Sequence, residues 1–520
     1  MRSPVIKSLR LIVFFSVTPL SAQSDAVETY RVQSVRFAGN FHFSSSTLLQ
    51  QMSSAPPSQF ARWVRKSPPL FYDAQGLQAD IEQLTRFYQR EGYLHAYLTL
   101  AEVNPHHQRR SVSLTIDVQE GLPVRVSAIR YRLNAGSAPE NTKAMVEKGF
   151  DNLKLQVGTR FRDEWLKQDV DRLTLFLLDS GFPYAKISHR LEVNTAENSA
   201  IIIYDVQTGP AAVFGPVVFE GRDRSDERVI SRQLAFEPGE TFQKRALDKS
   251  QRRLYNLNLF EVATVRALLP QPPQSEIPIQ VTVREAPLFT AKFGFGYGRE
   301  EQLRTFVNLQ RLQFFGGARR LNLQFKHTAL EPYYVDARLI QPALYRPGVT
   351  IGVNPFMRRQ TEPGFRLSRN GANLFVQQVI GTALNAGITY TFEQVDLDLS
   401  SVAVKTLSEK LRGLYNKSSL FIGLSVGTTD NPFAPTAGHR HSFNVKYSGL
   451  GAGEYHYVKW MIDLRNYQKL GGFVAATRLS LGRIASFDAF GVVPVEDLFF
   501  SGGANSVRGW GRHELGPRDA

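Results

Sequence analysis

The sequence predicts an array of small α+β modules followed by an antiparallel transmembrane β-barrel. The first observation is a strand–helix–strand unit that recurs about every 85 residues between Tyr30 and Glu285. The second is a change, from Phe289 onward, to alternating apolar and polar residues over stretches of about ten residues. The third is a short apolar segment behind basic residues at the N-terminus, which is typical of an exported protein.

The N-terminus predicts a secretory signal peptide over residues 1–22. Three basic residues accompany an apolar stretch, 11–20, that is too short to span a membrane. Small residues at positions 21 and 22 are typical of a cleavage point. We therefore expect cleavage near Ala22 and a mature chain that lies outside the cytoplasm.

The composition excludes several classes of site. The chain has 520 residues, a net charge of +15 and no cysteine, so disulfides, thiolate metal sites and cysteine nucleophiles are excluded. The lysines and arginines are scattered, and no basic block or known motif supports binding to nucleic acid. Contact with anionic lipid or lipopolysaccharide is compatible with the charge, but a solvated basic surface and a polar barrel lumen explain it more simply.

Each repeated unit opens with an alternating strand, continues with an amphipathic helix and closes with a second alternating strand. The opening strand ends in glycine in the first and third copies, at Gly39 and Gly221. In the first copy the helix carries apolar residues at spacings of three and four, namely Leu77, Ile81, Leu84, Phe87 and Tyr88. We predict three domains, over residues 28–121, 122–210 and 211–286, each with helices on one face of a short sheet.

The repeated unit resembles the POTRA domain. The matching features are a strand that ends in Gly-Asn, the pair Phe43-Ser44, a helix that ends in Gly92-Tyr93 and a closing strand that runs into Glu120-Gly121. This resemblance implies a sheet with an exposed edge strand that can bind a client strand through backbone hydrogen bonds. The sequence does not indicate which edge is free.

The second half of the chain, residues 287–520, predicts about eleven strands between Phe289 and Phe487. In one of them, apolar residues at positions 384, 386, 388, 390 and 392 alternate with glycine or polar residues. Such strands suit a barrel wall with lipid outside and a wet lumen inside. The charged stretch Ser400–Lys417 is predicted to be an extracellular loop, and so is the segment after the eleventh strand.

A glycine-containing segment with a distinctive ending follows the eleventh strand. Its residues include Gly502, Gly503, Ser506, Val507, Arg508, Gly509 and Trp510. The segment closely resembles the long sixth extracellular loop of the BamA/TamA outer-membrane assembly factors, which carries a Val/Ile-Arg-Gly-aromatic motif. The resemblance implies that the loop folds back into the lumen, where Arg508 binds acidic groups on the barrel wall through its bidentate fork.

The same resemblance implies a barrel of sixteen strands, whereas only ten residues follow Trp510. We therefore expect a barrel that is incomplete at its C-terminus, with about eleven of sixteen strands present, because an edge-free barrel cannot close without the others. Three modules favour a TamA-like protein over the BamA type, which usually carries five. A TamA-like protein implies a TamB-like periplasmic partner.

A glycine-rich stretch predicts the first strand of the barrel. A nucleotide-binding loop would need a helix directly after the glycines, and here another alternating strand follows. Weak side-chain packing makes such a strand easy to unpair. In the family, the seam between the first and last strands is the proposed opening for clients. We extend this role to Phe293, Gly294, Phe295, Gly296, Tyr297 and Gly298.

No residues predict catalysis, a cofactor or a metal site. His439 and His441 could share one strand face, but no acidic residue or further histidine stands near them in the sequence. Glu496 and Asp497 are adjacent and would point apart in an extended segment, which makes them a poor acid–base pair. We therefore expect neither enzymatic activity nor a cofactor.

These features and the resemblance together predict an outer-membrane assembly or translocation factor with its modules in the periplasm. The implied mechanism is capture of unfolded outer-membrane protein or autotransporter clients by the modules, followed by insertion through the seam. The alternative is an export pore of the two-partner secretion type, which usually has two modules and an N-terminal plug helix. Here the modules begin within about ten residues of the expected cleavage site, which argues against a plug.

Overall fold

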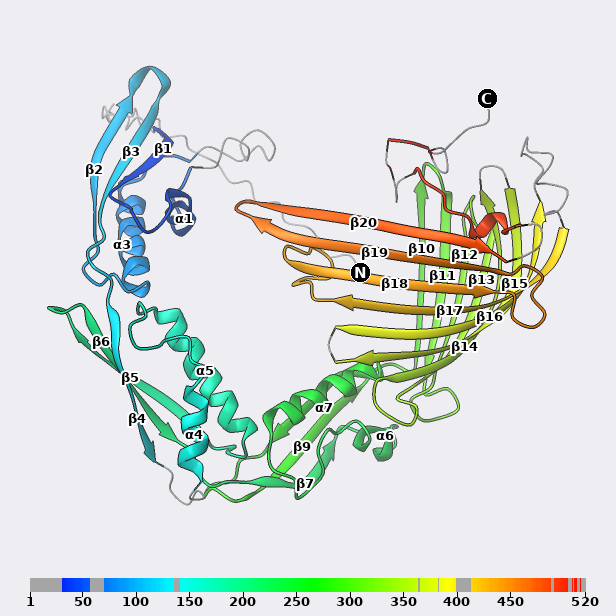
Figure 1. Cartoon of the computed structure of the whole chain (residues 1–520), viewed down its shortest axis with the longest axis horizontal. Helices are drawn as coiled ribbons and strands as arrows, with labels where there is room; N and C mark the ends of the chain where they lie inside the picture. The colour runs from blue at the N-terminus through cyan, green and yellow to red at the C-terminus, as the bar shows by residue number, and fades with distance from the viewer. Residues whose placement is uncertain are drawn as a thin grey trace, which may run out of the picture. The chain divides into compact units, whose positions relative to one another are not determined.

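The computed structural model describes residues 30–56, 70–134, 141–362, 365–381, 383–398, 413–487, 491–503, 507, 509–511 and 515. The predicted signal peptide lies outside this range, as do Ser506 and Arg508. Three α+β modules precede one large antiparallel sheet, which confirms the predicted fold class (Figure 1). The first two modules form one compact unit, and the third forms a second unit with the large sheet and with residues 177–184.

The three modules share one order of elements. The first contains β1 (Arg31–Ala38), α1 (Ser45–Gln51), α3 (Ala74–Arg90), β2 (Tyr97–His106), a 3₁₀ turn η1 (His107–Arg109) and β3 (Ser111–Gln119). The second contains β4 (Arg125–Asn134), α4 (Thr142–Phe150), α5 (Asp163–Asp179), β5 (Lys186–Asn194) and β6 (Ser199–Gln207). The third contains β7 (Val213–Glu220), α6 (Glu227–Ser231), α7 (Lys244–Asn256), β8 (Phe260–Ala267) and β9 (Glu276–Glu285). All of these elements lie inside the domain ranges proposed from the sequence.

In each module the last strand is central. It runs parallel to the first strand and antiparallel to the middle one, in the sheet orders β1-β3-β2, β4-β6-β5 and β7-β9-β8. The middle strand and the short first helix of every module were not predicted from the sequence. Most side chains of β2 and β5 are exposed or half-buried, so the alternation that marks a half-buried strand is weak there. Helices α1 and α6 are seven and five residues long, too short to show a helical period.

The glycine that ends the opening strand is required by a close approach between strands. Gly39 and Gly221 have φ angles of +81° and +70°. A Cβ at Gly39 would overlap the carbonyl oxygen of Val118, and one at Gly221 would overlap that of Val283. These carbonyls belong to the closing strands β3 and β9, so the repeated glycine reports the parallel pairing of the first and last strands.

A buried polar side chain occupies the same place on the long helix of each module. Asp80 on α3 accepts hydrogen bonds from the backbone amides of Ser53 and Ser54, each at 2.8 Å. Asp169 on α5 and Ser250 on α7 accept equivalent bonds from the chain that leaves the preceding short helix. A buried amide without a partner costs about 1–3 kcal/mol. These side chains therefore fix the short helix against the long one.

Among the described residues, one edge of each small sheet is covered and the other is open. The amide of Val32 on β1 donates to the carbonyl of Leu70 at 2.9 Å, and equivalent bonds from Val126 and Phe214 cover β4 and β7. Among the described residues, no strand pairs with the outer edge of β2, β5 or β8. The structure thus assigns the open edge, which the sequence did not indicate, to the middle strand of each module.

In the part of the chain that the structure describes, the large sheet contains eleven strands, which confirms the predicted number. They are β10 (Phe289–Gly298), β11 (Gln302–Leu312), β12 (Arg320–His327), β13 (Tyr333–Pro342), β14 (Val349–Glu362), β15 (Phe365–Ile380), β16 (Leu384–Asp398), β17 (Gly413–Gly427), β18 (Gly438–Ser448), β19 (Tyr457–Leu470) and β20 (Phe473–Ser486). Neighbours pair in chain order, so β10 and β20 are the edges of the sheet as described. No helix in the described ranges is long and apolar enough to cross a membrane.

The predicted loop Ser400–Lys417 is wrong at its C-terminal end. Residues 399–412 lie outside the described residues, but Gly413–Lys417 belong to β17 and pair with β16. The charge of Lys417 suggested a loop, whereas its side chain is buried on one face of the sheet. A charged side chain can belong to a strand when its charge is paired, and the partners of Lys417 are described below.

Alternation along the strands gives the large sheet an apolar face and a polar face. Val376, Ile388 and Leu424 are exposed on the first face. Glu393 and Lys417 are buried on the opposite face, against which the chain after β20 packs. We call the polar face the inner face and the apolar face the outer face.

The third module packs against the start of the large sheet through a shared core. Leu312 and Ala318, next to the turn between β11 and β12, belong to the same buried cluster as Ile277 on β9. The Gln313 side chain donates to the hydroxyl of Ser225 at 2.9 Å. These contacts tie the module to the first strands of the sheet.

Glu285 makes this junction sensitive to acid. Its carboxylate accepts hydrogen bonds from the backbone amides of Arg224 at 3.0 Å and Ser225 at 2.7 Å, and from Arg224 Nε at 2.7 Å. Burial alone would raise the pKa of Glu285, but these donors outweigh it and lower the pKa from 4.5 to about 2. Because the folded pKa is depressed, the carboxylate stabilises the module at neutral pH, and this contribution is lost as the pH falls from about 4.5 towards 2.

We expect Glu285→Gln to destabilise the third module by roughly 3 kcal/mol at pH 7 and to flatten its acid dependence between pH 5 and pH 3. The measurement is hydrogen exchange of residues 211–286 in the full chain, labelled at several pH values. Glu276→Gln, an exposed position on the same strand, is the matched control. A Glu285→Gln protein that follows the wild-type pH profile would contradict the assignment.

Candidate functional site on the inner face of the sheet

The chain after β20 turns back onto the inner face. Val492 and Val495 pack against a buried cluster at the ends of β15, β16 and β17, formed by Phe365, Leu367, Val395, Leu397 and Tyr415. The Phe499 ring covers Gly482 on β20 so closely that a Cβ there would overlap it, and Lys459 Nζ lies 4.4 Å from the centre of the same ring. Residues 491–503, which we call the inward segment, therefore contact strands from β15 to β20.

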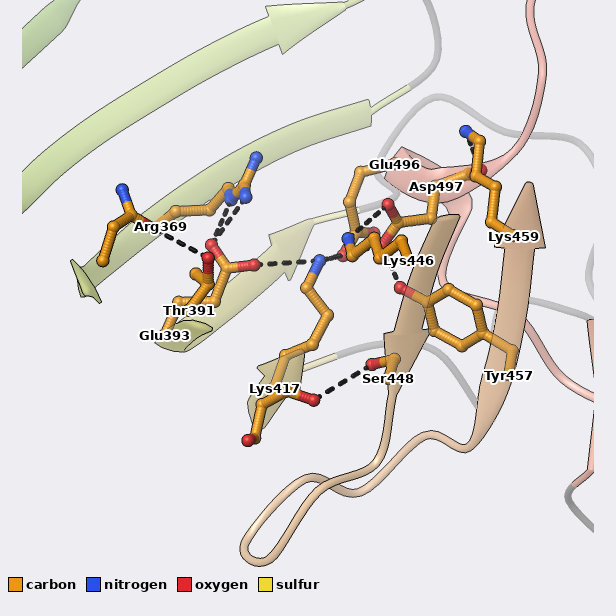
Figure 2. A network of polar contacts seen from close by, with 12 residues as sticks. Arg369, Thr391, Glu393, Lys417, Lys446, Ser448, Tyr457, Lys459, Glu496 and Asp497 are labelled. Carbon is orange, nitrogen blue, oxygen red and sulfur yellow. Dashed lines mark hydrogen bonds and ion pairs between the residues drawn. The ribbon is translucent and has the colours of Figure 1, made fainter. Parts of the chain in front are cut away.

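Two acidic residues anchor the inward segment. Glu496 and Asp497 lie in the 3₁₀ turn η2 (Val495–Asp497). Lys417 Nζ lies 2.7 Å from Glu496 Oε1 and 3.0 Å from Asp497 Oδ2 (Figure 2). The expectation that these carboxylates point apart is wrong, because the segment forms a turn rather than an extended strand and the turn brings both onto one ammonium group.

Asp497 has further partners on the neighbouring strands. Lys446 Nζ on β18 lies 2.7 Å from its Oδ1, and the hydroxyl of Tyr457 on β19 donates to its Oδ2. Lys459 Nζ donates to its backbone carbonyl at 2.6 Å. The hydroxyl of Tyr415 donates to Glu496 at 2.7 Å. One turn of the inward segment thus binds side chains from three strands.

The network continues across the wall to β15. Lys417 Nζ lies 3.1 Å from Glu393 Oε1 on β16, and the guanidinium of Arg369 on β15 contacts Glu393 Oε2 at 2.6 Å. The Lys417 side chain is only 1% exposed, so its charge depends on these carboxylates rather than on water. Figure 2 shows Arg369, Glu393, Lys417, Glu496 and Asp497 as one connected set. This arrangement can hold the inward segment against the wall through charge pairing.

The structure describes only part of the predicted loop motif. Ser506 and Arg508 lie outside the described residues, so the contact predicted for Arg508 stays a prediction. Gly502 and Gly503 end the inward segment with φ angles of +105° and +89°. The amide of Gly503 donates to the carbonyl of Trp510 at 3.0 Å, and the amide of Trp510 donates to that of Val507 at 3.1 Å, with Gly509 in the turn between them.

The six predicted seam residues all lie in β10. Phe293, Phe295 and Tyr297 are each more than 80% exposed on the outer face. Gly294 and Gly296 lie on the inner face, where the Phe306 ring and the Arg304 guanidinium of β11 cover them. Their role in a seam stays a prediction, and the structure adds that β10 is an edge of the sheet as described.

The two histidines share one face of β18. The rings of His439 and His441 stack with centres 4.6 Å apart. No group of three side chains that could hold a metal ion comes together among the residues that the structure describes.

The sequence does not predict the anchoring network. Lys417 falls at the end of the predicted loop, and its partner Asp497 is 80 residues away in the chain. The sequence does contain one signal of this network. If the strand after the loop begins at Gly413, five residues earlier than predicted, its pairing with β16 places Lys417 directly opposite Glu393. Opposite charges at such positions are a common cross-strand pair.

Family comparisons match both halves of the chain. The model of the Omp85 superfamily domain matches residues 313–520. The model of the surface antigen variable number repeat, or POTRA, matches residues 30–121 and 212–286. The second module is not part of these matches, but it has the same order of elements and the same sheet topology as the other two.

Similar proteins combine the same two parts. The outer membrane protein assembly factor BamA of Nitratidesulfovibrio vulgaris is 21% identical, with 85% of this chain and 55% of that protein aligned. BamA of Neorickettsia risticii is 22% identical, with 94% of this chain and 64% of that protein aligned. The chain thus spans between about half and two thirds of the length of these relatives.

A solved structure has the same fold. The crystal structure of BamA from Haemophilus ducreyi lacking POTRA domains 1–3 superposes with a TM-score of 0.56 at 18% identity, covering 76% of each chain. Together with the two matching family models, this likeness accounts for the modules and the sheet alike. The chain belongs to the BamA/Omp85 family, with its sheet in the outer membrane and its POTRA modules in the periplasm.

Proposed function

We propose that this protein is an outer-membrane protein assembly factor that captures client strands on its modules and assists their insertion at the edge strand β10. The observation that carries the proposal is the open strand edge in each module, because an unpaired edge binds an extended chain through its backbone with little demand on sequence. The names of the relatives, outer membrane protein assembly factors, support the same activity. Anionic outer-membrane lipid and a TamB-like periplasmic protein are the further partners of this proposal.

Of the three open edges, β5 is best suited to capture. The edge of β2 contains Pro105, which lacks an amide donor, and a bulge between Leu100 and Glu102. On β8, the amide of Val265 is already within 3.4 Å of the Gln251 side chain of α7. The nine residues of β5 pair with β6 in unbroken register and include no proline.

A proline scan of β5 tests strand capture. Of two neighbouring residues such as His189 and Arg190, one amide points to β6 and the other to the open edge. Proline at the outward position should keep the module folded and reduce capture at least fivefold. Because the chain has no cysteine, capture is measured as the disulfide yield between Ser188→Cys and a urea-unfolded eight-stranded barrel protein with one cysteine.

The controls separate the mechanism from the function. Thr99→Pro on β2 should leave the yield within twofold of the starting protein. Equal disulfide yields from the two variants with proline at His189 or Arg190 and from the protein with an unchanged β5 would exclude β5 as the capturing edge. A protein that does not accelerate client folding in liposomes, compared with empty liposomes, would refute the assembly function itself. A large, steady conductance in planar bilayers would favour the export pore instead.

A further inference from the structure

A polar hollow of about 250 Å³ lies on the inner face beside the edge strand β10. Its centre is a block of four amide side chains on β11 and β12. Asn308 lies opposite Gln324, and Gln310 lies opposite Asn322. We call this block and its surroundings the amide hollow.

Charged and hydroxyl side chains flank the amides on the neighbouring strands. Lys292 and Thr290 on β10 lie opposite Asn308 and Gln310. Asp336 and Arg338 on β13 flank the other side and also line the hollow. Asp336 accepts a hydrogen bond from Asn354, which starts a ladder of side chains across the inner face towards Glu393. The amide hollow and the anchoring network therefore lie on the same face of the sheet.

The amides of the hollow are incompletely paired. The side-chain oxygens of Asn308 and Asn322 are buried and have no hydrogen-bond donor among the residues that the structure describes. Farther along the same face the amides are paired, since Asn373 donates to Asn354 at 2.9 Å and accepts from Thr391 at 2.7 Å. A buried acceptor without a partner costs about 1–3 kcal/mol, so a ligand that supplies donors would be stabilised here.

The chemistry of the hollow fits a peptide backbone. An amide side chain offers one carbonyl acceptor and two N–H donors, and each peptide unit offers one donor and one acceptor. Such pairing needs no particular client sequence. The charged residues at the margins, Lys292, Asp336 and Arg338, leave a net charge of only +1. Four strands at a spacing of about 4.8 Å span roughly 14 Å, the length of about four residues of extended chain.

We propose that the amide hollow binds the backbone of an extended client segment next to the edge strand β10. This inference rests on the proposed assembly function and assigns it a binding site. Peptide groups cannot face lipid without hydrogen-bond partners. A segment that has entered beside β10 but has not yet paired with another strand needs such partners, and the hollow supplies them on the wet face of the wall.

The first test uses single cysteines in the full chain in liposomes. Asn308→Cys measures client contact with the hollow, and Ser425→Cys measures client contact with the wall outside it. Ser425 lies on the same inner face, because it is an even number of residues from Lys417 on β17. The probe is a urea-unfolded eight-stranded barrel protein with one central cysteine. We expect at least a fivefold higher disulfide yield at position 308 than at position 425. Equal yields would overturn the proposal, and so would protection of position 308 from a small thiol reagent in the free protein.

The second test removes the amides while preserving side-chain volume approximately. Asn308→Val combined with Asn322→Val should slow client folding in liposomes at least fivefold. Circular dichroism and heat-dependent gel migration must match the wild type, which shows that the wall is intact. If the wild type accelerates client folding and the variant does so equally well, the role of the hollow is refuted and the assembly function stands. If the wild type itself does not accelerate client folding, the assembly function is refuted. Competition by maltoheptaose as strong as that by unlabelled client would assign the hollow to saccharides and overturn the proposal.

Discussion

Replacement of Lys417 by methionine should destabilise the wall that carries the inward segment by about 3–5 kcal/mol. The side chain is 1% exposed, and its ammonium group lies within 3.1 Å of three carboxylates. Methionine has a similar length but no charge. Glu393, Glu496 and Asp497 would then keep their negative charges in a buried place with too few cations. The measurement is urea unfolding in detergent micelles, followed by tryptophan fluorescence, to which Trp460 on β19 contributes.

The control for this prediction is Lys469→Met, because Lys469 is exposed at the end of β19. That change should alter stability by less than about 0.5 kcal/mol. Neutralising the partners as well, with Glu393→Gln and Glu496→Gln added to Lys417→Met, should recover a large part of the loss, because the cost arises from unpaired charge. If Lys417→Met unfolded at the same urea concentration as Lys469→Met, Lys417 would not be the centre of the network.

Most of the fold follows from local patterns. The apolar spacing of α3 identifies its buried residues Leu77, Ile81, Leu84 and Tyr88, and long alternating stretches identify β10 and its neighbours. These signals are local, because each depends only on which residues of a single helix or strand face the core. The middle strands of the modules were not predicted. Both faces of β2, for example, lie partly in solvent at the open edge, which weakens the alternation of apolar and polar residues.

The anchoring network depends on contacts that no local pattern contains. Lys417 and Asp497 meet only because β17, β18 and β19 pair in a fixed register and the chain then turns back over them. The sequence did not predict the turn at Glu496, because a 3₁₀ turn of three residues has no sequence period to detect. The resemblance to the family directed attention to Arg508, whereas the described anchor of the inward segment is acidic and lies eleven residues earlier.

Two regions of the inner wall, β15 to β20 and the strands near β10, differ in how their described polar side chains are paired. From β15 to β20, ion pairs on the inner face join wall residues to the inward segment or to one another, as in the pairing of Asp463 with Arg465 and Arg478. Near β10, the amide oxygens of Asn308 and Asn322 lack a described partner. On one side, the ion pairs of this wall hold its own loop, and beside an edge strand two of its described amide oxygens lack partners. Such a wall is suited to hold the loop while it accepts another chain at that edge.

Asp497→Asn should release the inward segment while the sheet stays folded. The substitution preserves the shape of the side chain but removes the charge that Lys446 and Lys417 share. Lys417 keeps Glu393 and Glu496, but Lys446 loses its only carboxylate contact among the ion pairs of the described residues. Hydrogen bonds to charged groups contribute about 1.5–3 kcal/mol each, so the docking free energy should fall by about 3 kcal/mol.

Thiol labelling measures this release directly, because the chain has no cysteine of its own. Val495→Cys lies in the docked turn, and its labelling rate should rise about 100-fold when Asp497→Asn is added, since each 1.4 kcal/mol is a factor of ten. Asp396→Asn, an exposed carboxylate on β16, should leave the rate unchanged. Labelling at the docked rate in the Asp497→Asn protein would show that this carboxylate does not hold the segment.

A double-mutant cycle with Lys446→Met separates the contact between the two residues from the general loss of charge. If Lys446 and Asp497 interact as their 2.7 Å separation indicates, the effects of the two substitutions on docking should fall short of their sum by about 1–3 kcal/mol. Effects that add within about 0.5 kcal/mol would show that the two charges act independently. Docking would then depend on Lys417 and on the apolar contacts of Val492 and Val495, so the cycle identifies which side of the inward segment holds it to the wall.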